Sequence, residues 1–213
     1  SQLGKLLRMT EYGEAPSDNP FKDAPFVYSY GHRNPQGLIV DAASETIWMT
    51  EHGPKGGDEL NRVEPGKNYG WPAITYGVDY SGAIISPFTE APGMEQPVTY
   101  WVPSIATSGL ALYTSGAIPS LTGKLLVGGL KSKSIVAVDV SSTTPVLSEP
   151  FPNIEVRVRD VRALRDGSVA VINEEGGTVI RIAFDRTADQ LLATREAEGL
   201  PRLRGERAGA ARG

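Results

Sequence analysis

The chain has 213 residues, of which 40% are hydrophobic and 22% charged, and its formal net charge is −4. This length can bury a sizeable core in one domain or two, and the acidic balance argues against a nucleic-acid binder, which is usually basic. The absence of cysteine excludes disulfides, zinc-thiolate sites and a cysteine nucleophile within the chain, and no apolar run is long enough to cross a bilayer.

The first part of the chain mixes turn signals with short apolar runs. The 24 glycines and 16 prolines imply many turns, which favours an all-β fold. Residues 4–9 form a short β-like run, and Asp18-Asn-Pro-Phe predicts a turn. The stretch from Tyr28 to Trp71 then combines glycines, which let the backbone approach a ligand, with an arginine fork suited to carboxylates. We therefore predict that this stretch forms the rim of a binding site.

A pattern of three short strands occurs three times along the chain. Each copy has an apolar run, a turn, a second apolar run, a polar loop and an alternating run, as in the blades of a β-propeller. Propellers close with about four to eight blades. Three blades and a leading strand therefore predict that further residues of a longer protein, or another chain, complete the ring. The copies comprise residues 36–41, 45–50 and 59–64, then 108–113, 123–129 and 134–140, then 159–164, 166–172 and 178–184.

Two further segments differ from these repeats. Residues 66–103 are rich in glycine, proline and aromatic residues without a clear period, which is typical of an insertion that carries function on a rigid scaffold. From residue 187 onward alanine, arginine, glutamate and glycine dominate. We predict a propeller part at 1–186 and a C-terminal helix or tail at 187–213, with a short helix near 189–198 and a solvated end.

Three groups of polar side chains are candidates for chemistry. Without cysteine or a His-x-x-x-His spacing, a structural role is favoured over metal binding for the two histidines, His32 and His52. Acids near glycine-rich loops suit Ca²⁺, although solvated turn acids are the better interpretation from local sequence. Cations at equivalent ends of adjacent blades would converge on the propeller axis and bind an anion, or form a solvated basic edge. The acids are Asp58, Glu59 and Asp79, and the cations are Lys131, Arg157 and Arg159.

Three motifs around the predicted rim are more specific. They read Tyr-Gly-His-Arg-Asn-Pro-Gln-Gly-Leu at 30–38, Gly-Pro-Lys-Gly-Gly-Asp-Glu-Leu-Asn at 53–61 and Asn-Tyr-Gly-Trp-Pro at 68–72. In this order they resemble the soluble glucose/sorbosone (aldose sugar) dehydrogenases that depend on pyrroloquinoline quinone, and the resemblance runs from about residue 3 to 184. It implies a six-bladed β-propeller, of which this chain would supply three to four blades. Nucleophile-elbow, P-loop and dinucleotide-binding motifs are absent from the sequence.

The resemblance also implies an activity. Members of that family oxidise aldoses such as glucose at C1 to lactones, with the quinone and Ca²⁺ as cofactors, and pass the electrons to an external acceptor. A periplasmic or secreted location follows from the same resemblance. We expect neither a membrane span nor a nucleic-acid partner.

Roles at the cofactor follow from the resemblance residue by residue. Arg33 would lie over the quinone and polarise its reactive C5 carbonyl, with Asn34 and Gln36 lining the same pocket. Ser104 would contact the cofactor. The cations that would neutralise its carboxylates are Lys131, Arg157 and Arg159.

The resemblance further implies calcium sites. Backbone carbonyls of Gly53 and Pro54 would bind the Ca²⁺ that the cofactor chelates and that acts as a Lewis acid. Glu59 and the Tyr69 carbonyl match a structural Ca²⁺ site. A second structural site matches the Thr75 and Gly77 carbonyls and the Asp79 side chain.

One functional group of the family is not expected in this chain. The family's general base, a histidine in an early blade, precedes the matched segment, and neither His32 nor His52 aligns with it. We therefore expect the C-terminal part of a dehydrogenase that is inactive without its N-terminal blades. Two alternatives stay open from the sequence: a non-catalytic Ca²⁺-stabilised propeller that acts as a binding module, and a calcium-dependent lactonase-type hydrolase.

Overall fold

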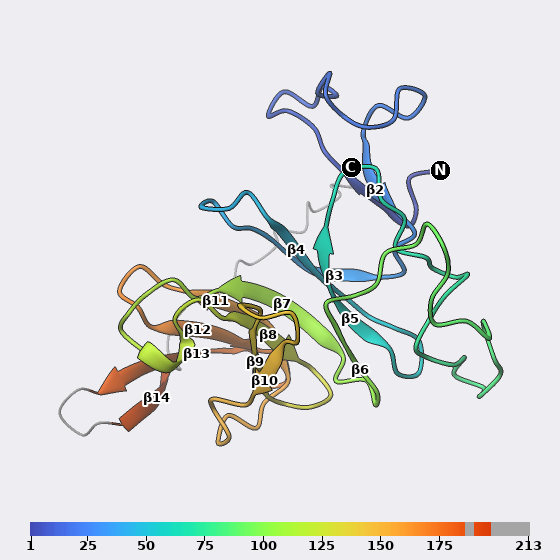
Figure 1. The fold of residues 1–213 in the computed structure, drawn as a ribbon. Helices are drawn as coiled ribbons and strands as arrows, with labels where there is room; N and C mark the ends of the chain where they lie inside the picture. Colours follow the sequence, from blue (N-terminus) through green and yellow to red (C-terminus); the bar gives the residue numbers. More distant parts are fainter. Residues whose placement is uncertain (186–189, 197–213) are drawn as a thin grey trace, which may run out of the picture.

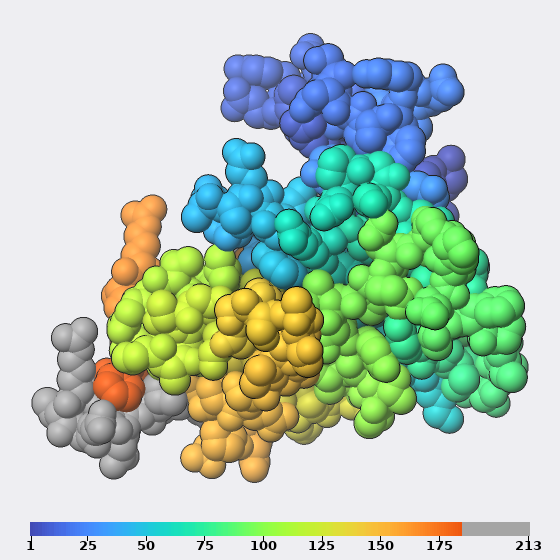
Figure 2. All heavy atoms as spheres, in the orientation of Figure 1, coloured from blue at the N-terminus to red at the C-terminus, as the bar shows by residue number. Residues whose placement is uncertain are grey.

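The computed structural model describes residues 1–185 and 190–196. Within these residues the chain forms antiparallel β-sheets, one of two strands and three of four strands, and a 3-10 turn η1 at Pro119–Leu121 (Figure 1). The two-stranded sheet pairs β1 (Lys5–Leu7) with β2 (Val27–Tyr30). Its residues pack on the next sheet, and Figure 2 shows the N-terminal part of the chain, in dark blue, as a lobe above it.

Each four-stranded sheet is a meander in which consecutive strands are neighbours. The first blade contains β3 (Pro35–Val40), β4 (Ile47–Glu51), β5 (Asp58–Val63) and β6 (Thr99–Trp101). The second blade contains β7 (Thr107–Leu112), β8 (Leu125–Gly129), β9 (Ile135–Asp139) and β10 (Val146–Ser148). The third blade contains β11 (Val158–Ala163), β12 (Val169–Asn173), β13 (Thr178–Asp185) and β14 (Gln190–Glu196).

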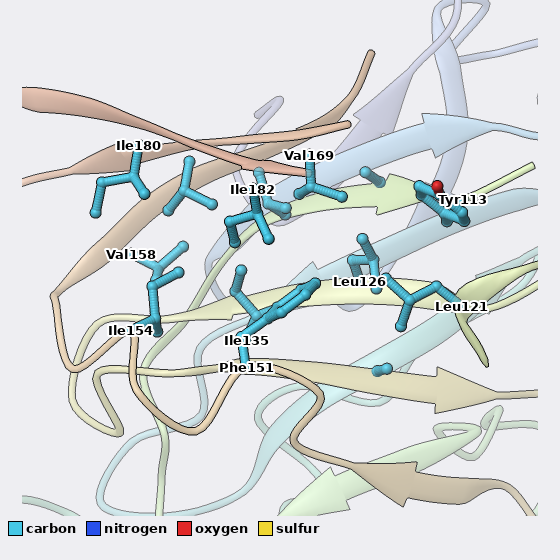
Figure 3. Packing of buried hydrophobic residues seen from close by; sticks show 14 of the residues in the cluster. Tyr113, Leu121, Leu126, Ile135, Phe151, Ile154, Val158, Val169, Ile180 and Ile182 are labelled. Atoms are coloured by element: carbon cyan, nitrogen blue, oxygen red, sulfur yellow. The ribbon is translucent and has the colours of Figure 1, made fainter. Parts of the chain in front are cut away.

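The blades stack through their faces, and this stacking makes the fold a partial β-propeller. The inner strand β7 contacts both other inner strands, β3 and β11. Hydrophobic side chains fill the space between the first and second blades and, in a larger cluster, between the second and third (Figure 3). The second blade is therefore covered on both faces, which explains why every residue of β8 is buried.

The structure confirms the three predicted repeats as blades and adds a fourth, outer strand to each. The outer strands β6 and β10 have three residues each, too few to show a hydrophobic period. The helix predicted near 189–198 is wrong, because Gln190–Glu196 forms β14, which pairs with β13. Pairing with an open strand edge outweighs the helix propensity of this leucine- and alanine-containing segment. The rest of the predicted tail, 197–213, lies outside the described residues.

Turns at one end of the blades are stabilised locally. Those after β3, β9 and β11 each contain an aspartate whose carboxylate accepts a hydrogen bond from a serine two or three residues later, at 2.5 to 2.6 Å. These hydrogen bonds lower the pKa of all three carboxyls. The aspartates are Asp41, Asp139 and Asp166. Helices with the length and hydrophobicity that a membrane crossing requires are not found in the described part of the chain.

A buried tyrosine links the second and third blades and provides a test of the packing. The fully buried Tyr113 hydroxyl donates to the Gly167 carbonyl and accepts the Ile118 N–H at 3.1 Å. Tyr113→Phe keeps the ring but leaves two buried groups without a partner, so the free energy of unfolding should fall by about 1 to 3 kcal/mol. Urea denaturation measures this change. The control Tyr12→Phe, at a side chain that is 82% exposed, should shift stability by less than about 0.5 kcal/mol; equal effects would contradict the link.

Candidate functional site

The predicted site residues gather at one end of the blades. In each blade the start of the inner strand lies beside the loop between the second and third strands, because neighbouring strands are antiparallel. We call this region, the starts of β3, β7 and β11 with the three adjoining loops, the polar end. One backbone hydrogen bond of 2.9 Å recurs there in each blade: His52 to Asn34, Lys131 to Ile105, and Glu174 to Arg157.

An irregularity of strand pairing directs two of the predicted side chains. The pairing skips Gln36 in β3 and Arg159 in β11, and β7 has a bulge at the equivalent place. Bulges re-aim side chains, and here Gln36 and Arg159 line one hollow together with Gly109. A Cβ at Gly109 would lie 2.0 Å from Asp160 Oδ1, so only glycine fits there. The exposed Gln36 side chain also donates to Asn34 Oδ1 at 3.0 Å.

Arg33, just before β3, is held at several points. Its main-chain N–H donates to Glu51 Oε2 at 2.7 Å, and its Nη1 donates to the His52 carbonyl at 3.2 Å. Its guanidinium carbon lies 5.2 Å from the centre of the Trp71 ring, which is within range for a cation-π contact. Arg33 Nε is buried and has no hydrogen-bond partner among the described residues. One donor of Arg33 therefore makes no hydrogen bond within the described residues.

The predicted cations lie beside an acid that the sequence did not single out. Glu174 Oε2 accepts from Arg157 Nε at 2.8 Å, and its other oxygen pairs with Arg159. Hydrogen bonds from these two guanidiniums lower the pKa of Glu174, and the bond from Arg159 has the larger effect. Arg157 Nη1 also reaches the Leu130 carbonyl at 3.4 Å, next to the exposed Lys131. Glu174 thus pairs with two of the predicted cations within the chain, and it stands in a polar loop whose sequence alone gives no such signal.

A buried carboxylate organises the loop with the predicted metal carbonyls. Asp58 accepts the Gly53 N–H at 3.1 Å, the Thr107 N–H at 3.3 Å and the Ser104 hydroxyl at 2.7 Å. Ser104 Oγ also accepts a nearby main-chain N–H at 3.0 Å. The Gly53-Pro54 segment is tightly packed, since a Cβ at Gly53 would lie 2.2 Å from the carbonyl oxygen of residue 56.

Four of the predicted calcium ligands line one small cavity, about the size of a single water molecule or ion: Gly53, Glu59, Tyr69 and Thr75. Burial raises the pKa of Glu59 to about 8, and the charges of Glu51 and Asp58 contribute to the shift. Asn61 Oδ1, on the same strand, is buried without a hydrogen-bond partner in the described part of the chain. Glu51 and Glu59 on the wall of the cavity suit a cation with oxygen ligands, and Arg33 lies on the same wall.

The other predicted calcium ligands lie outside this cavity. Gly77 and Asp79 do not line it. Asp79 Oδ1 accepts from the Ser81 hydroxyl at 2.6 Å and the Ser81 N–H at 2.9 Å, which lowers the pKa of Asp79. Thr75 Oγ1 accepts the Gly77 N–H at 3.2 Å. Within residues 1–185 and 190–196, no three His, Asp or Glu side chains are grouped as a metal site.

Both histidines have structural hydrogen bonds, as predicted. His32 is 1% exposed, with Nδ1 3.2 Å from Glu51 Oε1 and Nε2 2.8 Å from Ser29 Oγ. His52 Nε2 lies 2.6 Å from the Thr107 carbonyl oxygen.

The raised pKa of Glu59 predicts a pH-dependent stability in metal-free buffer. Because about 8 exceeds the ordinary 4.5, the folded chain binds more protons than the unfolded chain between these pH values, and stability falls as the pH rises through this window. Glu59→Gln removes this loss, so in EDTA at pH 8 it should be more stable than wild type, by an amount on the order of 1 to 3 kcal/mol that shrinks toward pH 4.5. Thermal unfolding from pH 5 to 8 measures it. The exposed control Glu11→Gln should follow wild type, and parallel curves for all three proteins would refute the prediction.

Comparison with known proteins identifies relatives of this chain. The sequence matches the Glucose / Sorbosone dehydrogenase family over residues 1–181. The aldose sugar dehydrogenase YliI of Escherichia coli is 41% identical over 188 residues, which are 84% of this chain and 51% of that protein. The crystal structure of the soluble aldose sugar dehydrogenase from Escherichia coli in the apo-form is 42% identical, covers 80% of this chain and 51% of that chain, and has a TM-score of 0.75.

A more distant structure is the PQQ-bound aldose sugar dehydrogenase of Streptomyces coelicolor. It is 28% identical, with a TM-score of 0.59, over 89% of this chain and 51% of that chain. The chain thus spans about half the length of the relatives it matches. From the match over residues 1–181 and the shared propeller fold, we conclude that the chain belongs to the glucose/sorbosone dehydrogenase family.

Proposed function

We propose that this chain forms part of the active site of a dehydrogenase that oxidises aldoses such as glucose at C1 to lactones. Pyrroloquinoline quinone and Ca²⁺ would be its cofactors, and an external acceptor would take the electrons, in the periplasm or outside the cell. The observation that carries the proposal is the polar end, which combines a basic group on the third blade with crowded acids on the first. Because the chain spans about half the length of its relatives, the activity is proposed for the whole protein.

The third blade fits a ligand with several carboxylates. Arg157 and Arg159 are held side by side by one carboxylate, Glu174, so another carboxylate could take its place with the same charge pairing. The exposed Lys131 adds a third positive charge from the neighbouring blade. We assign these three cations to the carboxylates of the quinone cofactor.

Arg33 would bind the reactive carbonyl of the cofactor. When bound, the quinone accepts hydride from the sugar, while Ca²⁺ polarises the carbonyl. The guanidinium of the half-buried Arg33 would donate to that oxygen and stabilise the negative charge that forms on it. Asn34 and Gln36, exposed amides joined by a hydrogen bond, would bind sugar hydroxyls and the cofactor edge. His32 and His52 are engaged internally, and we assign proton abstraction to neither.

The first blade would hold calcium. The Gly53 and Pro54 carbonyls are assigned to the cation at the cofactor, and the small cavity beside Glu59 to a second, structural cation. Because the Ser104 hydroxyl is already engaged by Asp58, we assign Ser104 to shaping the wall beside the cofactor. The remaining ligands are assigned as follows: Tyr69 and Thr75 to the cavity, and Gly77 with Asp79 to a further site in the insertion.

A second candidate function follows from the charge pairing. Glu174 neutralises two of the three predicted cations without any ligand. This observation favours, as the alternative, a Ca²⁺-stabilised propeller that binds a sugar or a protein without redox chemistry.

Titration of the folded chain with pyrroloquinoline quinone separates the two candidates. We expect saturable binding that EDTA abolishes, followed by the absorbance of the quinone and by calorimetry. Replacing Lys131, Arg157 and Arg159 by alanine should weaken binding by at least about tenfold, because three charge-assisted contacts are lost.

The matched control for this titration replaces three cations away from the polar end, Arg8, Lys22 and Arg62, and so removes the same charge. It should change the affinity by less than about twofold. Equal losses in both triple variants would contradict the assignment of the basic group, and no binding by folded wild type would favour the second candidate.

A further inference from the structure

We propose that Glu51 is a positioning residue for Arg33, and that its buried carboxylate fixes the main chain from which the Arg33 side chain starts. This inference deepens the proposed function, because it rests on the role assigned to Arg33 at the quinone. Glu51 does not touch the reacting atoms in this assignment; it acts through Arg33.

The carboxylate of Glu51 is fixed by three donors. It is 3% exposed, and it accepts the Arg33 N–H at 2.7 Å, Asn61 Nδ2 at 2.9 Å and His32 Nδ1 at 3.2 Å. With the Glu51 carboxylate as the acceptor, His32 is the donor of this pair through Nδ1. The Ser29 hydroxyl then donates to His32 Nε2, 2.8 Å away. This chain of contacts locks the orientation of the acceptor that faces Arg33.

Arg33 needs such an anchor because it precedes the sheet. The pairing of β3 with β4 begins at Pro35, opposite Glu51, so the Arg33 amide receives a side-chain acceptor where a strand residue would have a backbone partner. The far end of the side chain is fixed by the His52 carbonyl and by the Trp71 ring. Fixing both ends of a flexible arginine removes, before any ligand binds, the rotamer entropy that binding would otherwise cost.

Stability alone does not account for a carboxylate at this position. Glu51 lies directly opposite Glu59 in the pairing of β4 with β5. Two acids that face each other in a buried region cannot both ionise without cost, and a buried charge is costly unless fully hydrogen-bonded. A neutral side chain would avoid this cost but could not accept from three donors at once. The arrangement therefore favours control of Arg33 over stability.

Nuclear magnetic resonance of the whole chain tests the anchor without any cofactor. In wild type the Arg33 amide should exchange with solvent as slowly as strand amides, and the Arg33 Nε–H signal should show a rigid group. Glu51→Gln leaves one acceptor oxygen for three donors, so exchange should become at least about tenfold faster and the Nε–H group more mobile. Ser29→Ala is the matched control: it breaks the far end of the same network without touching Glu51 or Arg33, and should leave both signals unchanged.

Rapid exchange of the Arg33 amide in wild type would overturn the proposal, and this measurement stands even where Glu51→Gln fails to fold. Equal changes in the Glu51 and Ser29 variants would overturn it as well, since they would reveal a purely structural network.

A double-mutant cycle on quinone affinity in Ca²⁺ tests the consequence for the ligand. Glu51→Gln should weaken binding about tenfold in the wild-type background and less than about twofold in an Arg33→Ala background. Equal losses in both backgrounds would show that Glu51 acts independently of Arg33 and would overturn the proposal. If wild type does not bind the quinone, the proposed function fails, while the exchange and mobility of Arg33 still decide the positioning role.

Discussion

The buried carboxylate of Asp58 joins the first blade to the second, and the polar end depends on that junction. It is 0% exposed and accepts from two main-chain amides and the Ser104 hydroxyl. An unpaired charge at this depth would cost several kcal/mol, so the loop after β4 and the chain entering β7 must both bend toward it. Glycines make that loop permissive, and Asp58 selects one conformation from many. The Gly53 carbonyl and the start of β7 are thereby fixed relative to each other.

The polar end has crowded acids on the first blade, beside Arg33, and two arginines held by Glu174 on the third. Acids crowd the first blade around Glu51 and Glu59, while Arg157 and Arg159 lie on the third. An anionic ligand that also chelates a cation would match both groups better than a simple anion would. Its anionic groups would pair with the arginines of the third blade, and its cation would pair with the acids of the first.

The sequence reveals the blades better than it reveals the contacts of the site. Inner strands were predictable because their apolar residues fill the spaces between blades, whereas β14 is defined by pairing with β13 and its own residues favour a helix. Arg33 could be recognised from a motif and Lys131 from its place in the loop after a blade strand, and their shared location follows from antiparallel order. Glu51 and Glu174 could not be recognised from the sequence, because the groups that they bind come from other strands and loops. Asp58 was predicted as a turn acid and instead holds two blades together.

The two ends of the propeller are open to different kinds of evolutionary change. Each inner strand carries its bulge at the polar end. In β3 and β11 the residues on either side of the bulge pair with consecutive residues of the next strand, so loss of the bulged residue would keep this register and would remove only the side chain that the bulge re-aims. At the opposite end, the turns after β3 and β9 are closed by an aspartate–serine hydrogen bond within the turn, whereas the turn after β11 also bonds to Tyr113 and Arg181. We therefore expect changes of length in the first two turns, and exchange of side chains such as Gln36 and Arg159 at the polar end.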